Sequence, residues 1–169
     1  MNNVDAVELL CIKNKFPSNG FAMMRSEAGT YAVIFQCLSK ATQQVGKLGM
    51  ISLKEGYYVY VGSAFGPGGV KARVSHHFRS TVKPNWHIDY LRRFMRPVTV
   101  LYTYDHRRLE HRWAKVFFKM NNMSSFRGFG CSDCACYSHL FFTFEKPEPA
   151  VLFNALAGDI EVESFNNAG

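Results

Sequence analysis

One stretch, GYYVYVGSAFGPGGVKARVSHH from Gly56 to His77, constrains the fold more than any other part of the chain. It opens with aromatic and β-branched residues, Tyr57 to Val61, which predict a strand. Four glycines and one proline at positions 62–69 then predict a tight, exposed turn. After Pro67, apolar residues recur at helical spacing, namely Val70, Val74 and Phe78. The unit carries Arg73 and two histidines on its helix, so it could hold a phosphate or could be an ordinary β-loop-α unit.

The other segments predict an α+β fold. Strands are expected over Thr30–Leu38, Val98–Tyr104 and His139–Phe144, and an extra hairpin from Gln44–Gly46 and Met50–Leu53. Helices are expected over Trp86–Met95 (capped by Asn85, ended by Pro97), from Leu109 to Met120 after a cap at Asp105, and over Pro147–Ala157. Because strands and helices do not alternate regularly, we expect a small mixed or antiparallel β-sheet flanked by helices.

The predicted helices and strands divide the chain into three parts. Residues 1–27 are expected to form an N-terminal extension, with a short helix or strand at Val7–Ile12 and a turn or linker at Pro17–Gly20. Residues 28–146 form the main domain, and residues 147–169 form a C-terminal helix and tail.

Composition favours a folded protein with a polyanionic partner. Of the 169 residues 47% are hydrophobic and 15% aromatic, which excludes a disordered chain. Lysine and arginine total 20 against 13 acidic residues, a formal net charge of +7, and ten of the basic residues lie between Lys71 and Arg112. Such clustering is typical of nucleic-acid binding, although a basic surface kept for solubility has the same composition.

The sequence predicts neither a membrane span nor a secretory leader. No apolar run approaches the roughly 20 residues that a membrane helix needs. The apolar run Val7–Ile12 is too short for the core of a signal peptide with its cleavage site. We therefore expect a cytoplasmic protein whose five cysteines are reduced.

Two short signatures and three single residues resemble the GIY-YIG nuclease family. Gly29-Thr30-Tyr31 and Tyr60-Val61-Gly62 resemble the paired tripeptides that name it. Arg73, His77 and Glu110 stand where that family has an arginine, a His or Tyr, and a metal-binding glutamate. The strings YVYVGSA, NWHIDY and FGCSDCACYSHL resemble a less-characterised branch, classed as a domain of unknown function. The resemblance covers roughly residues 29–144 and implies a GIY-YIG-like fold with an extra hairpin and an N-terminal extension.

The resemblance implies a metal-dependent DNA endonuclease whose site is built from Tyr31, Tyr60, Arg73, His77 and Glu110. The chemistry of these residues fits, because Glu110 can hold one hard Mg²⁺ or Mn²⁺ ion and Arg73 can bind a phosphate through two hydrogen bonds. His77 shares the helix face of Arg73 through its i, i+4 spacing. The family implies that Tyr60 helps to orient or deprotonate the attacking water. A phenol with its ordinary pKa of about 10 needs a nearby cation to act as the base.

Three departures from the family pattern leave a second function open. The first is length, because 28 residues lie between Tyr31 and Tyr60 and include the extra hairpin. The second is Ser63, which stands where repair-type members often have a lysine. The third is the loop between Gly62 and Arg73, which is longer than in the simplest members. A non-catalytic nucleic-acid-binding module that keeps the nuclease fold is therefore the alternative to DNA cleavage.

A second constellation combines Cys131, Cys134, Cys136 and His139. Four soft ligands within nine residues suit Zn²⁺, but the spacing lacks the two separated knuckles of a strong zinc signature. In the preferred interpretation the loop lies beside the active site, where Ser132, Asp133 and His139 act, and the cysteines pack as small hydrophobic residues. With zinc bound, a third function is a stabilised surface for a partner protein.

Two further histidines, His76 and His87, are candidates for contacts to the substrate. His87 lies in the segment Trp86–Tyr90 together with Asp89. These side chains either contact DNA or serve the packing and capping of a helix, and the sequence favours neither.

Overall fold

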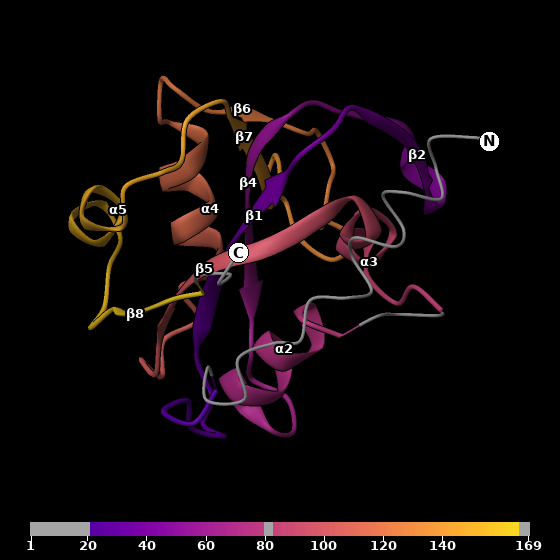
Figure 1. Ribbon diagram of the computed structural model, residues 1–169. Helices are drawn as coiled ribbons and strands as arrows, with labels where there is room; N and C mark the ends of the chain where they lie inside the picture. Colours follow the sequence, from indigo (N-terminus) through magenta and orange to yellow (C-terminus); the bar gives the residue numbers. More distant parts are fainter. Residues whose placement is uncertain (1–20, 80–82, 166–169) are drawn as a thin grey trace.

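The computed structural model describes residues 21–79 and 83–165, so the expected segments Val7–Ile12 and Pro17–Gly20 lie outside it. Its main feature is a six-stranded antiparallel sheet in the order β6-β7-β4-β1-β5-β8 (Figure 1). The strands are β6 Ser124–Ser125, β7 Leu140–Thr143, β4 Gly56–Ser63, β1 Thr30–Cys37, β5 Met95–Thr103 and β8 Glu161–Ser164. A separate hairpin pairs β2 Ala41–Val45 with β3 Gly49–Leu53. The α+β class, the antiparallel sheet and the extra hairpin expected from the sequence are confirmed.

Helices cover both faces of the sheet (Figure 1). Helices α2 (Gly69–His77) and α3 (His87–Leu91) lie on one face, while α4 (Glu110–Phe118) and α5 (Pro149–Ala155) lie on the other. Alternate residues of the central strand β1 therefore enter different cores. Tyr31 and Val33 pack with α2 and α3, whereas Ala32 and Ile34 pack with α4. Burial on both faces explains why β1 is almost wholly apolar.

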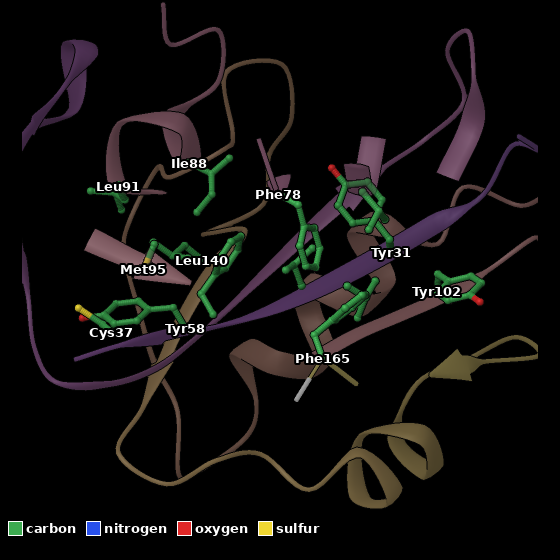
Figure 2. Close-up of a cluster of buried hydrophobic side chains, with 14 of the residues drawn as sticks. Tyr31, Cys37, Tyr58, Phe78, Ile88, Leu91, Met95, Tyr102, Leu140 and Phe165 are labelled. Atoms are coloured by element: carbon green, nitrogen blue, oxygen red, sulfur yellow. The ribbon is translucent and has the colours of Figure 1, made fainter. Parts of the chain in front are cut away.

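The core on the α2–α3 side is rich in aromatic side chains. Figure 2 shows part of it, including Tyr31, Phe78 and Phe165, the last of which follows β8. Phe78 contacts Phe165 with ring centroids 4.5 Å apart. This packing brings the end of α2 against the sheet and so positions the helix that carries Arg73 and His77.

The expected helix over Trp86–Met95 is shorter than predicted. Its α-helical part is α3, a 3₁₀ turn follows at Arg92–Phe94, and β5 begins at Met95. Pro97 therefore does not end the helix. It lies inside β5, where the register with β1 shifts and a residue without an N–H is tolerated. The helix cap is Trp86 rather than Asn85, because the Asp89 carboxylate accepts the backbone N–H groups of both.

The expected cap of α4 is also wrong. Asp105 binds Arg107 instead, and the helix begins after Leu109, whose N–H donates to Thr30 Oγ1 over 3.2 Å. Strand β8 was not predicted. Figure 1 shows it at the edge of the sheet beside β5. None of the described helices is long and apolar enough to cross a membrane.

Candidate functional site

Tyr31 and Gly62 come from the two signatures and face each other across β1 and β4. A Cβ atom on Gly62 would lie 2.4 Å from the phenol oxygen of Tyr31, which no real side chain allows. The missing side chain thus lets the Tyr31 ring lie across β4. In that position the phenol hydroxyl is 2.8 Å from Nε2 of His77 on α2.

His77 contacts both signature tyrosines, Tyr31 and Tyr60. Its ring centroid lies 5.5 Å from that of Tyr60, which projects from β4 on the same face as Tyr31. The side chain is fully buried, and Nδ1 has no hydrogen-bond partner in the described part of the chain. Burial lowers the pKa of His77 well below its ordinary value, and the positive charges of Arg92, His76 and Arg73 add to this effect. The imidazole is therefore neutral near pH 7.

The phenols of Tyr31 and Tyr60 are protonated at neutral pH. Burial raises the pKa of Tyr31 and of Tyr60 well above the ordinary value, and negative charge on Glu110 raises both further, whereas Arg73 lowers them. The charges of Arg73 and Glu110 thus affect the pKa of both tyrosines. The direction of the pKa change suits neutral hydrogen-bond donors better than general bases.

Arg73 lies at the edge of this group. Its guanidinium carbon is 4.6 Å from the ring centroid of Trp86, and the Gly66 turn passes close to one of its NH₂ groups. Trp86 also packs against His76, with ring centroids 4.5 Å apart. His76 Nε2 is 2.9 Å from Asp89 Oδ1, so these two side chains tie α2 to α3.

Glu110, in the first turn of α4, is paired with His139. The distance from Glu110 Oε1 to His139 Nδ1 is 3.2 Å, and His139 Nε2 lies 3.3 Å from Cys134 Sγ. Burial lowers the pKa of His139, but the hydrogen bonds with Glu110 and Cys134 raise it by more. His139 thus bridges the expected metal ligand and the cysteine loop.

Four donor atoms gather on the outer side of this pair. One atom from each of His111, Cys134, Cys136 and His139 lies within 4.8 Å of every other, a cluster that could hold a metal ion. Cys131, a ligand in the sequence-based hypothesis, is not among them, and its Sγ donates instead to the Phe129 carbonyl. His111 takes its place. His111 was not predicted as a ligand, and its one signal in the sequence is its position next to Glu110.

The remaining expected residues divide into two groups. His87 and Ser63 lie near the tyrosines. His87 Nδ1 accepts the Gly130 N–H over 3.0 Å, and Ser63 ends β4 opposite Thr30. Ser132 and Asp133 are exposed in the cysteine loop.

A pocket of about 690 Å³ lies on the α4 side of the cysteine loop. Asp133, His111, Cys134 and Cys136 line it, together with apolar side chains of α4. None of the five residues expected in the active site contributes to this pocket.

Gly130 connects the two groups of side chains. A Cβ atom there would lie 2.9 Å from His139 Cβ and 3.6 Å from the Tyr60 ring, and its φ of +72° favours glycine. The tyrosine group and the His/Cys cluster are therefore separated by a single backbone segment.

Comparison with family models matches residues 30–161 to the family described as Domain of unknown function DUF123. Neither the curated proteins nor the solved structures contain a match to the chain.

Proposed function

We propose that this chain, which belongs to the DUF123 family, is a metal-dependent endonuclease that hydrolyses phosphodiester bonds in DNA. The observation that carries the proposal is the arrangement around His77: Tyr31 is hydrogen-bonded to it, Tyr60 packs against it, and the charges of Arg73 and Glu110 act on both phenols. These are the five residues through which the sequence resembles the GIY-YIG nucleases.

Each of these side chains has a defined task in phosphodiester hydrolysis. Arg73 would bind a non-bridging phosphate oxygen and stabilise the negative charge that develops there. Tyr60 would hold the attacking water through its hydroxyl, since its raised pKa keeps the phenol protonated. Neutral His77 would hold Tyr31 in place through the 2.8 Å hydrogen bond. The network thus positions the water and the phosphate.

The divalent ion would bind at Glu110. Its side chain is 23% exposed, and while Oε1 faces His139, no described residue hydrogen-bonds to Oε2. One free carboxylate oxygen fits Mg²⁺ or Mn²⁺, which keeps several waters when a protein supplies few ligands. Such an ion would polarise the phosphate oxygen.

A cleavage assay tests the proposal. The full chain is incubated with plain, nicked and branched DNA duplexes and Mg²⁺ or Mn²⁺, and the products are separated on denaturing gels. We expect cleavage that falls at least about 100-fold in Glu110→Gln and in Arg73→Lys. The first removes the carboxylate charge that would hold the divalent ion, and the second keeps the positive charge but removes the two parallel hydrogen bonds of the guanidinium. Glu145→Gln, which changes an exposed carboxylate after β7, is the matched control and should cleave as the wild type does. Cleavage that persists unchanged in Glu110→Gln contradicts the proposal.

The non-catalytic DNA-binding module is the second candidate. It is favoured by the raised pKa values of the tyrosines, which leave no base among them, and by Ser63, which adds no cation. This candidate predicts DNA binding by the wild type without cleavage by any of the variants. The same gels, read beside a binding assay, separate the two candidates.

We also propose that the protein acts in the cytoplasm. Cys37, Cys131, Cys134 and Cys136 are all free thiols, as expected in a reducing compartment.

A further inference from the structure

We propose that His111, Cys134, Cys136 and His139 bind one zinc ion, which closes the cysteine loop onto helix α4. The binding itself does not depend on the proposed nuclease activity, and only its consequence for Glu110 rests on that function. Two thiolates and two imidazoles are a ligand set that zinc prefers and that Mg²⁺ does not.

The donor atoms already have the spacing of a zinc tetrahedron. With Zn–S of about 2.3 Å and Zn–N of about 2.0–2.1 Å, a tetrahedron has S···N edges of about 3.5 Å. Two of the S···N edges are 3.3 Å, from Cys134 Sγ to His139 Nε2, and 3.1 Å, from Cys136 Sγ to His111 Nδ1. All four donors lie within 4.8 Å of one another, so small side-chain movements complete the coordination.

The ligands come from three separate parts of the fold. His111 lies in the first turn of α4, Cys134 and Cys136 lie in the loop, and His139 immediately precedes β7. The base of the loop is closed by two backbone hydrogen bonds, Gly128 N–H to the Tyr137 carbonyl and His139 N–H to the Phe129 carbonyl. The zinc ion would fix the rest of the loop, because it joins the cysteines to a helix and to the sheet.

His139 connects the proposed zinc ion to Glu110. When Nε2 ligates zinc, Nδ1 keeps its proton and donates a hydrogen bond to Glu110 Oε1, which lies 3.2 Å away, shared with the Val61 carbonyl at 3.3 Å. In zinc sites, the ring nitrogen of a histidine ligand that does not bind the metal commonly donates a hydrogen bond to a carboxylate. Zinc binding would thereby hold Glu110 at the place where the proposed divalent ion binds.

The cluster is accessible to an ion from solution. His111 is exposed, and three of the ligands line the pocket beside α4. Binding requires both thiols to release their protons to solvent, so affinity rises with pH.

Zinc titration of the full chain tests the inference. The protein is purified without chelators, its zinc content is measured by elemental analysis, and the stripped protein is titrated with Zn²⁺ against a chromogenic chelator. We expect one zinc per chain, and an affinity more than about 100-fold weaker in His111→Asn and Cys134→Ser than in the wild type. His111→Asn changes an exposed side chain and so removes a ligand without opening the core.

The matched control is Cys131→Ser, which alters a cysteine of the same loop that lies outside the donor set. It should bind zinc as the wild type does. Glu110→Gln should weaken zinc binding by about 10- to 100-fold, as the loss of an outer partner does. Loaded with Co²⁺, the wild type should show the intense visible bands of tetrahedral cobalt and thiolate charge transfer in the near ultraviolet.

Three results would overturn the inference. The first is a wild type that binds no zinc in the titration. The second is zinc loss in Cys131→Ser but not in His111→Asn, which points to the ligand set expected from the sequence. The third is a weak, octahedral Co²⁺ spectrum. A chain that binds zinc but leaves DNA intact supports the zinc site and refutes the nuclease, so the two proposals fail separately.

Discussion

At the scale of single residues, His77 has the most unusual environment of the candidate site. It is fully buried, it shares one hydrogen bond with Tyr31, and Nδ1 has no partner in the described residues. The ionisable groups around it are the phenols of Tyr31 and Tyr60, the ring of His76 and the positive charges of Arg92 and Arg73. No carboxylate in the described part of the chain is paired with this ring, so protonation of His77 is unfavourable in the folded state.

The lowered pKa of His77 predicts a pH-dependent stability. In the unfolded chain His77 binds a proton at about pH 6.5. In the folded chain it does so only at a much lower pH. Stabilisation by the neutral ring is therefore complete above about pH 7 and is lost as the pH falls through 6.5 toward the folded pKa. Urea unfolding at pH 7 and pH 5 gives the free energy of unfolding at each pH. The decrease from pH 7 to pH 5 should be smaller in His77→Gln than in the wild type, by up to about 2 kcal/mol.

The control for this measurement is His106→Gln, which changes an exposed histidine. It should lose as much stability between pH 7 and pH 5 as the wild type does. Equal losses in His77→Gln and the wild type would show that His77 takes up a proton as readily in the folded chain as in the unfolded one, contrary to its burial.

At the scale of elements, α2 and α3 are joined by one buried carboxylate. The Asp89 side chain is fully buried and accepts the N–H groups of Asn85 and Trp86 as well as a hydrogen bond from His76. It thereby caps its own helix and fixes the helix that carries Arg73. Helical periodicity cannot reveal such a role, since Asp89 reads as an ordinary residue of the first turn.

Asp89→Asn is expected to destabilise the protein by about 1–3 kcal/mol. The substituted amide turns a donor toward groups that are themselves donors, which leaves buried N–H groups without acceptors. The free energy of unfolding in urea measures the loss. Asp133→Asn, at an exposed loop position, should change it by less than about 0.5 kcal/mol. Equal stability of both variants would refute the structural role of Asp89.

At the scale of the whole molecule, the fold determines where the positive charge lies. The chain carries a net charge of +7, and many of its basic residues lie on α2, the helix of Arg73, and in the sequence after it. A polyanion bound there would release counterions in proportion to the phosphates that the protein contacts.

DNA affinity should therefore fall steeply with salt. In a plot of log K against log salt concentration, we expect Arg79→Gln to reduce the slope by about 0.9, the contribution of one phosphate contact. Arg79 is exposed just after α2, the helix of Arg73. Lys146→Gln, near α5 on the opposite face, should leave the slope unchanged. Fluorescence anisotropy with a labelled duplex measures all three slopes, and identical slopes would place the DNA on another surface.

The strands and long helices were predictable because their signals are local. The apolar run of β1, the aromatic run of β4 and the stripe of Trp113 and Phe117 on α4 each follow from burial on one or two faces. Strand β8 was missed because its residues are mostly polar and exposed, so that only pairing with β5 makes it a strand. The helix boundary near Pro97 was wrong because sheet pairing prevails over helical periodicity there.

The sequence by itself determined the α+β class, the residue types of the site and the presence of a cysteine-rich loop, because composition, periodicity and motifs are properties of the chain. Only the tertiary structure decided which of these residues meet. It put His111 of α4, not Cys131, beside Cys134 and Cys136, and it paired Glu110 with His139. It also raised the pKa values of the two phenols. The reason is physical: which side chains meet and which are desolvated depends on contacts between segments far apart in sequence, and no local pattern encodes them.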